Sequence, residues 1–448
     1  MKIKRIIITA AASGLVAVGA QAQTNDQLQK ALAQAQAAAE QAQAAAKQAQ
    51  AALEQALAAA DSAKQSSVAA KPAGNSITTS GLTISSGANT ATLYGLIDVT
   101  LFNKNNATAA TPTAGPKSLT APQVAWFSGN RWGLTGPHAL GVNNDDLKAV
   151  FRLESEFESQ TGAMDTPGVL FNRDAWLGLE SKTFGKLTFG RQNALARDPA
   201  ASAVYGDPYG PAKASVEEGG YTNNNNFKQL IFYAGSSTGT RINNGVVWKK
   251  AFTNGLVAGA AYSFGAVAGS FNTGSSKTGS LAYNGNNYTV AGFATSANIG
   301  NLSHRTVSFG GNVQVSPLIR LNAGYYKYNS QQAAGLGDRS DTAYTLSTKV
   351  TPGGAWDYEL GYQTMRAKNA GVNAAGYVQN AFSDTSAIKG TATGNRNTLY
   401  GSVFYHLDSV TEFYLAFDRL NTTGGYLASQ ANGAKSQNEF GLGMRYKF

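Results

Sequence analysis

Apolar and polar positions alternate with a period of two along the last eleven residues of the chain. Glycine and charged residues occupy one face of this extended segment, and the other face carries Phe440, Leu442, Met444, Tyr446 and Phe448. An unpaired apolar edge strand invites aggregation in water. In a closed barrel within a bilayer, the apolar face contacts lipid, the other face lines a wet lumen, and pairing with the first strand removes the edge. The pattern therefore predicts the closing strand of a transmembrane barrel.

The same alternation begins near residue 91 and recurs along the rest of the chain. In residues 147–157 the odd positions are mostly apolar, and the even positions include Lys148, Arg152, Glu154 and Glu156. Charges confined to one face of a strand are costly in a soluble core, but they are natural beside water in a lumen. We therefore expect an all-β fold, a transmembrane antiparallel β-barrel of about 16 strands, over residues 91–448.

The connections between these strands alternate in length, which is typical of such barrels. Short turns are expected at residues 181–185, 253–255, 285–287, 316–317, 351–354 and 407–409. Long polar loops are expected at residues 104–123, 193–239, 268–278, 329–340, 369–393 and 421–436.

The first 90 residues follow other patterns. Residues 1–22 have a basic start, an apolar stretch and an Ala-Gln-Ala end, which predict a secretory signal peptide. Residues 24–65 are rich in alanine and glutamine, and an apolar seam repeats at spacings of four and three. This favours a parallel coiled coil that joins copies of the chain, with a single solvated helix as the alternative. Residues 66–90 are rich in Ser, Thr, Gly and Ala and predict a flexible linker.

The composition narrows the function. The chain has 448 residues, no cysteine and a net charge of +10, and its basic residues are not gathered in runs. This argues against a nucleic-acid partner and favours a positive cavity or an anionic surface partner. The three histidines lack the partners of a hydrolase or metal site, and no nucleotide-binding glycine motif is present, so we expect neither enzymatic activity nor a cofactor. A calcium site on Asp338, Asp341 and Asp384 is a weak alternative.

Several stretches together resemble the general porins of Gram-negative bacteria, in the branch common in betaproteobacteria. The match covers roughly residues 91–448, and the coiled coil lies outside that pattern. The last of these stretches is similar to the aromatic-ended close that the barrel-assembly machinery reads in that family, through Met444, Tyr446 and Phe448. The stretches are residues 91–98 (ATLYGLID), 131–136 (RWGLTG), 147–155 (LKAVFRLES), 171–179 (FNRDAWLGL), 184–192 (FGKLTFGRQ), 241–248 (RINNGVVW) and 445–448 (RYKF).

The resemblance implies a homotrimer of 16-stranded barrels, each an aqueous channel narrowed by an extracellular loop that folds inward. By motif match, Arg131, Arg173 and Arg241 would face that loop from the barrel wall. Lys148 and Arg152, which face inward by parity, would extend the positive wall. The alternative for each cation is an ion pair with a lumen carboxylate such as Glu154 or Glu156, or contact with lipopolysaccharide or a loop. The loop should lie in residues 193–239, and its acidic face would carry Asp207, Glu217 and Glu218, although loop charges are usually solvated.

These expectations describe a general diffusion porin of the outer membrane with mild preference for anions and the coiled coil in the periplasm. The expected partners are further copies of the chain, outer-membrane lipid, lipopolysaccharide and the barrel-assembly machinery. One alternative is a structural anchor, in which the coiled coil ties the barrel to peptidoglycan. A second alternative is a channel specific for one solute, and an enzyme is a distant third.

Overall fold

The computed structural model describes residues 81–86, 89–107, 117–123, 125–141, 146–197, 222, 224, 240–299, 301–332, 335–373, 377–378, 390–429 and 432–448. The predicted signal peptide, residues 1–22, and the predicted coiled coil, residues 24–65, lie outside these residues and stay predictions. The described part of the chain contains no helix that is long and apolar enough to cross a membrane.

The described residues form 18 strands. Their bounds are β1 Leu82–Ser86, β2 Asn89–Ala107, β3 Lys117–Gln123, β4 Asn130–Ala139, β5 Lys148–Phe157, β6 Asp174–Ser181, β7 Gly185–Asn193, β8 Arg241–Ala251, β9 Leu256–Ser263, β10 Ser276–Asn284, β11 Tyr288–Ile299, β12 Leu302–Ser316, β13 Ile319–Ser330, β14 Arg339–Val350, β15 Trp356–Val372, β16 Gly390–His406, β17 Thr411–Gly424 and β18 Ser436–Lys447.

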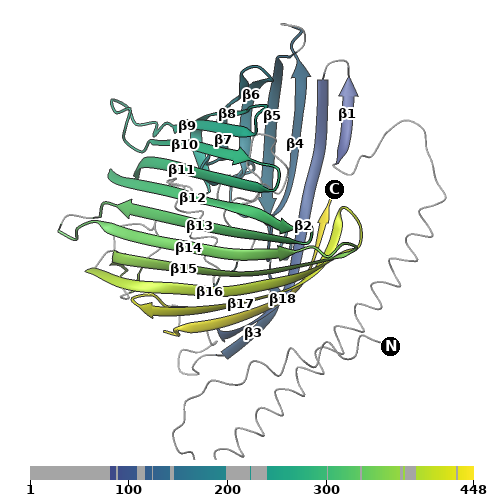
Figure 1. Ribbon diagram of the computed structural model, residues 1–448. Helices are drawn as coiled ribbons and strands as arrows, with labels where there is room; N and C mark the ends of the chain where they lie inside the picture. The colour runs from purple at the N-terminus through teal and green to yellow at the C-terminus, as the bar shows by residue number, and fades with distance from the viewer. Residues whose placement is uncertain are drawn as a thin grey trace, which may run out of the picture. The chain divides into compact units, whose positions relative to one another are not determined.

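The strands close into an antiparallel barrel (Figure 1). From β4 to β18 each strand pairs with the next one along the chain, and β2 completes the ring by pairing with both β4 and β18. The register partners of β1 and β3 all lie on β2, so 16 of the 18 strands make up the ring. The all-β prediction and the strand number are confirmed.

Two strands lie where the sequence predicts irregular chain. Residues 117–123 were expected to be loop, but they form β3. This strand pairs with β2 next to the place where the first residues of β4 pair with it. Residues 82–86 fall in the predicted linker, but they form β1, which pairs with the start of β2. Both segments are rich in Thr and Ser and carry few apolar residues. Their strand conformation comes from the unpaired edges of the long β2, which local composition does not reveal.

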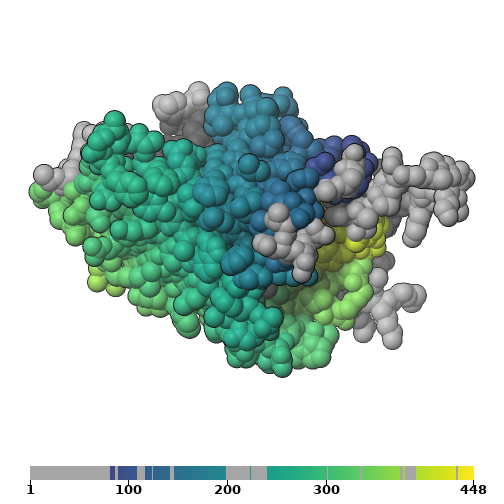
Figure 2. All heavy atoms as spheres, turned by 90° about the horizontal axis from the view of Figure 1, so that it is seen from above, coloured from purple at the N-terminus to yellow at the C-terminus, as the bar shows by residue number. Residues whose placement is uncertain are grey.

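The strands are polar inside and apolar outside. On β14 the side chains of Arg339, Asp341 and Thr345 are buried, whereas Tyr344 and Leu346 are more than half exposed. Across the sheet, outward residues pair with outward residues, so the exposed apolar side chains form a continuous band. Figure 2 shows the outer side chains of β8 to β13, from teal to green, as one unbroken surface. This is the arrangement that a bilayer stabilises and water does not.

The connections differ between the two ends of the barrel. At one end, which we call the short-turn end, the connections are residues 140–147, 182–184, 252–255, 285–287, 317–318, 351–355 and 407–410. At the other end, which we call the long-loop end, they are residues 108–116, 158–173, 194–240, 264–275, 300–301, 331–338, 373–389 and 425–435. The predicted alternation of lengths therefore holds, with two exceptions. At the short-turn end, residues 140–147 are as many as residues 331–338 at the other end. At the long-loop end, only residues 300–301 separate β11 from β12, a tight connection that the sequence pattern did not predict.

The closing strand has the predicted faces. Phe440 is well exposed on the outer face of β18, whereas Glu439 beside it is buried inside. At the end of the strand, Phe448 exchanges two main-chain hydrogen bonds with Gly95 of β2, at 2.8 and 3.1 Å. The Phe448 ring lies directly over Gly95, so that a Cβ at this position would be only 2.1 Å from the ring. The terminal aromatic therefore needs a glycine on the first strand of the ring.

We expect Gly95→Leu to reduce the yield of assembled barrel, because the new side chain displaces the Phe448 ring from the closing seam. The measurement is the fraction of purified protein that migrates as heat-modifiable folded barrel. Gly279→Ala is the matched control, since a Cβ at that outward-facing strand glycine meets no atom within 4 Å. Equal yields of the two variants would contradict the expectation.

Asp146 ties two turns together at the short-turn end. Its carboxylate accepts a hydrogen bond from the Ser181 hydroxyl at 2.6 Å and another from the Lys182 main-chain N–H at 3.0 Å. These bonds favour the charged form and lower the pKa of Asp146 to about 2, from an ordinary value of 3.8. Asp146 thus joins the β4–β5 connection to the β6–β7 turn.

We expect Asp146→Asn to destabilise the barrel at neutral pH. Because the folded-state pKa is depressed, the stabilisation by Asp146 is present above about pH 4 and is lost as the pH falls towards 2. Urea unfolding midpoints of the two proteins in detergent should therefore differ at pH 7 and converge near pH 2. A difference that persists unchanged at pH 2 would exclude this role.

Candidate functional site: a charged constriction in the lumen

Three of the predicted arginines come together inside the barrel. Arg131 is the second residue of β4, Arg173 directly precedes β6, and Arg241 is the first residue of β8. All three positions lie towards the long-loop end of alternate strands of one wall, and all three side chains are almost fully buried in the barrel. The short strands of this wall end at the same level, which is why residues distant in sequence meet here.

Arg173 is held by two carboxylates of β5. Its Nε donates a hydrogen bond to Glu154 and its Nη1 donates one to Glu156. The Arg173 main-chain N–H also donates to the Glu154 carbonyl oxygen at 3.2 Å. The Tyr94 hydroxyl donates to the second oxygen of Glu154 at 2.8 Å. The ion pair considered above as an alternative is therefore what Arg173 makes, and it fixes the guanidinium rigidly on the wall.

Arg152 continues the cluster along β5. Its guanidinium lies 3.8 Å from the carboxylate of Asp174. The same group lies over two aromatic rings, at 5.6 Å from the centre of Tyr94 and 6.0 Å from that of Trp176. Aromatic faces attract a guanidinium, so this side chain is oriented without being neutralised.

The other two arginines also contact oxygen atoms that carry no formal charge. Arg131 Nε donates to the Gly129 carbonyl oxygen at 2.8 Å, and Arg241 Nη1 donates to the Thr240 hydroxyl at 3.0 Å. On β4 to β8 the described residues thus bring the guanidinium groups of Arg131, Arg152, Arg173 and Arg241 together with the carboxylates of Glu154, Glu156 and Asp174. The four guanidinium groups stay charged at any usable pH, because arginine does not deprotonate.

Two sets of predicted site residues do not join the cluster. Lys148 begins β5 six residues before Glu154, so it lies about 20 Å away towards the short-turn end. Its register partner there is Glu180. Asp207, Glu217 and Glu218 lie outside the described residues, so the acidic face of the loop stays a prediction.

Two described residues of the connection between β7 and β8 lie against the opposite side of the barrel. The Thr222 hydroxyl donates to the Asp418 carboxylate of β17. Asn224 accepts a hydrogen bond from the Thr398 hydroxyl of β16 at 2.5 Å and donates to the Gln437 carbonyl oxygen of β18 at 3.3 Å. Both loop residues are fully buried. Since β16 is eight strands from β8 in either direction around the ring, these two residues lie on the far side of the lumen from β8.

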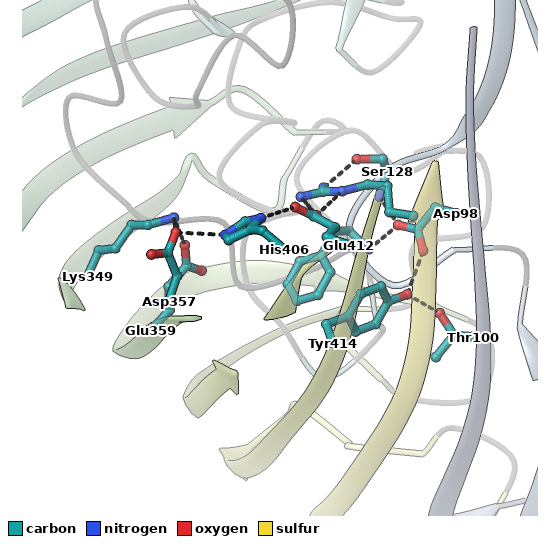
Figure 3. A network of polar contacts seen from close by, with 11 residues as sticks. Asp98, Thr100, Ser128, Lys349, Asp357, Glu359, His406, Glu412 and Tyr414 are labelled. Atoms are coloured by element: carbon teal, nitrogen blue, oxygen red, sulfur yellow. Dashed lines mark hydrogen bonds and ion pairs between the residues drawn. The ribbon is translucent and has the colours of Figure 1, made fainter. Parts of the chain in front are cut away.

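A second polar network lies on the inner wall near the short-turn end (Figure 3). It runs from Lys349 on β14 through Asp357 and His406 to Glu412 and Arg445, with N–O distances between 2.5 and 3.2 Å. Because Arg445 lies on β18 and Glu412 on β17, the network reinforces the strands next to the closing seam.

Asp98 extends this network across the seam to β2. Its carboxylate accepts a hydrogen bond from the Tyr414 hydroxyl at 2.5 Å and two from the main-chain N–H groups of Phe127 and Ser128, at 3.0 and 2.8 Å. The chain between β3 and β4 therefore turns into the lumen, where the Phe127 ring packs against Phe404 and Tyr414. This inward turn places Arg131 directly after it.

Charges on the inner wall are mixed, with basic residues in the majority. The inward-facing acidic residues are Asp98, Glu154, Glu156, Asp174, Glu180, Asp341, Asp357, Glu359, Glu412, Asp418 and Glu439. The inward-facing basic residues are Lys104, Arg131, Lys148, Arg152, Arg173, Lys186, Arg241, Lys249, Arg320, Arg339, Lys349, Arg396, Arg445 and Lys447.

A model of the Gram-negative porins matches residues 9–425. The chain belongs to this porin family. Over 83 residues it is 46% identical to an outer membrane porin protein of Bordetella pertussis, a match that covers 18% of this chain and 20% of that protein. The chain thus spans about a fifth of the length of the curated relative that it matches.

Solved porin structures share the fold. The anion-selective porin from Comamonas acidovorans aligns with a TM-score of 0.58 and 20% identity, over 80% of this chain and all of that one. A trimer form of OmpT from Vibrio cholerae aligns with a TM-score of 0.54 and 15% identity, over 81% of this chain and all of that one. At these identities the likeness concerns the barrel architecture.

Several residues that make these contacts inside the barrel of this porin were not predicted from sequence. Asp174 and Tyr94 join the arginine cluster, and both stand on the inward parity of strands that the sequence analysis recognised. Asp418, which holds the loop, also faces inward. The weak calcium alternative fails for Asp341, because that carboxylate faces the lumen and pairs with Arg339 at 2.7 Å. In the part of the chain that the structure describes, no group of acidic and histidine side chains is arranged to hold a metal ion.

Proposed function

We propose that this porin is a passive outer-membrane channel for small hydrophilic solutes and that it prefers anions. The observation that carries the proposal is the arginine cluster on β4 to β8, together with Thr222 and Asn224 of the β7–β8 connection, which contact Asp418 and Thr398 on the opposite wall. A channel narrowed at the level of fixed positive charges favours anions at its tightest point. The name of the Comamonas relative, an anion-selective porin, agrees with this direction.

The arrangement favours weak, nonspecific passage. The guanidinium groups are held by fixed partners, so they present charge to a passing ion without moving. Salt screens charges over about 8 Å at physiological ionic strength. The field therefore acts mainly where the lumen is narrow, and an anion gains enough to enter without binding too tightly to leave.

We propose that the channel works as a homotrimer with its short-turn end facing the periplasm. Short periplasmic turns and longer external loops are the rule for such barrels, and OmpT of Vibrio cholerae has been solved in a trimer form. In this orientation β1, with which the described residues begin, pairs with the start of β2 on the periplasmic side.

The test is a planar-bilayer recording of the full chain purified in detergent. We expect stepwise conductance, and under a KCl gradient we expect a reversal potential with the sign of anion preference. Bilayers that stay silent with heat-modifiable, folded protein would reject the channel and leave the barrel as an anchor. Saturable block by one solute would instead indicate a substrate-specific channel.

A further inference from the structure

An apolar groove of about 630 Å³ runs along the outer face of β9 to β12. Its floor is made by the small residues Gly279, Ala294 and Gly292. Gly279 of β10 pairs with Ala294 of β11, and Leu281 pairs with Gly292. Leu281 and, on β12, Phe309 rise beside this floor and are more than half exposed. The strands lie side by side on the surface seen in Figure 2. The volume of the groove is within the range of small-molecule sites in proteins.

A pair of basic residues caps the groove towards the long-loop end. Lys277 pairs with Ser296 across β10 and β11, and Ser296 pairs with Arg305 across β11 and β12. This row lies two residues along the strands from Gly279, on the same outward face. Lys277 and Arg305 are both exposed, and two strand spacings separate them, which is about 10 Å. The described part of the chain offers neither of them an acidic partner.

The sign of the charges is uniform over the whole outer wall. Every acidic residue of the described strands faces the lumen. The outward-facing charged residues of β7 to β17 are all basic, and all but Lys250 lie in the half nearer the long-loop end: Arg191, Lys250, Lys277, Arg305, Lys327, Arg366, Lys368 and Arg419. A surface sorted in this way is complementary to an anionic layer.

Aromatic side chains place the basic pair at a membrane boundary. Tyr262 is the register partner of Lys277 on β9. Its ring stacks on Phe271 with centres 5.1 Å apart and meets Phe264 at 4.8 Å. Aromatic girdles of this kind mark the interface between hydrocarbon and headgroups on barrels. Lys277 and Arg305 therefore stand at headgroup level, and the groove lies below them in the hydrocarbon.

We propose that this groove and its basic cap bind a phosphorylated lipid of the outer leaflet. An acyl chain lies along Gly279 and Gly292, and the phosphate bridges Lys277 and Arg305. Lysine offers the phosphate a compact positive charge, and arginine offers it a planar fork of N–H donors. A second copy is the less fitting occupant, because a two-fold contact would set the same basic residues against each other. The inference rests on the proposed function only for the location of the barrel in the outer membrane, and it does not require that the channel conducts.

Native mass spectrometry of the full chain in detergent tests the proposal, with diphosphoryl lipid A as the probe. The same measurement with phosphatidylethanolamine shows how much lipid is retained when the headgroup has no net charge. Inorganic phosphate shows how much binding the phosphate gives without acyl chains. We expect wild-type protein to retain lipid A most strongly. Lys277→Gln combined with Arg305→Gln should lower that retention roughly tenfold, since each basic residue near the membrane surface contributes separately.

The groove is tested by Gly279→Leu, which puts a branched side chain on the floor at a position where the added Cβ meets no atom within 4 Å. This variant should also lose lipid A. Arg419→Gln is the matched control, since it removes an outward basic charge from β17, away from the groove, and should change retention less than twofold. Equal losses in Arg419→Gln and in the Lys277/Arg305 pair would overturn the site, as would lipid A retention that Gly279→Leu leaves unchanged. A change of oligomeric state in Gly279→Leu would assign the groove to a second copy and overturn the proposal.

Heat-modifiability confirms that each variant is folded, and conductance is recorded on the same preparations. Normal conductance without lipid retention rejects this inference alone. Silent channels that still retain lipid A reject the proposed function alone.

Discussion

Arg131→Gln combined with Arg173→Gln is expected to reverse the ion preference of the channel. Among its described residues the cluster holds four guanidinium groups and three carboxylates, and the double variant keeps two guanidinium groups beside the same three carboxylates. Two unit charges about 4 Å apart interact by about 1 kcal/mol in water and more in a less polar surrounding. Because 1.4 kcal/mol is a factor of ten, the anion-to-cation permeability ratio should fall on the order of tenfold.

Reversal potentials under a KCl gradient measure that ratio. Lys148→Gln removes an inward positive charge far from the cluster and is the matched control, so it should shift the ratio much less. Arg131→Gln alone keeps the ion pairs of Arg173 with Glu154 and Glu156, and it should shift the ratio in the same direction by a smaller amount. A ratio that stays at the wild-type value in the double variant, with single-channel conductance intact, would remove the arginines from the selectivity mechanism.

Thr222→Val is expected to make the open channel noisy, with frequent steps between current levels. The Thr222 hydroxyl donates to the buried carboxyl group of Asp418, which is one of the few described contacts between the β7–β8 connection and the far wall. Removing one partner of a buried hydrogen bond costs about 1–3 kcal/mol. Its loss should raise the population of undocked loop by roughly tenfold or more. Single-channel recordings at high bandwidth measure the dwell times.

Two further variants make this test specific. Thr222→Ser keeps the hydroxyl and should keep the quiet channel. Thr306→Val makes the same substitution at a buried position on the inner wall of β12, where the hydroxyl has no hydrogen-bond partner among the described residues, and it should also stay quiet. Noise that appears equally in Thr306→Val, or that is absent from Thr222→Val, would show that Asp418 does not position the loop.

Much of the barrel follows from local pattern. Period-two alternation identified the strands, and within them it assigned Arg152, Glu154 and Glu156 to the lumen and Leu153 to the lipid. The aromatic end of the chain indicated closure, and the alternation of connection lengths indicated two unlike ends. These features are local because the direction of a side chain in a strand depends only on parity.

The composition of the constriction was less accessible. The three arginines were found through the family resemblance, and their meeting depends on the short strands β4 to β8 ending at one level. Lys148 has the same parity as Glu154, but parity does not say how far along the barrel axis a residue lies. Asp174 was not recognised, because its role arises from lying opposite Glu154 on the adjacent strand.

The sequence by itself determined which side chains face water and which face lipid, since that choice is made residue by residue along each strand. Only the tertiary structure decided which of them come together: Thr222 contacts Asp418, 196 residues apart, Phe448 contacts Gly95 at the seam, and Lys277 and Arg305 lie on either side of Ser296 above the groove. The physical reason is that register between strands is set by closure of the whole ring, so contacts across it depend on all the intervening strands at once.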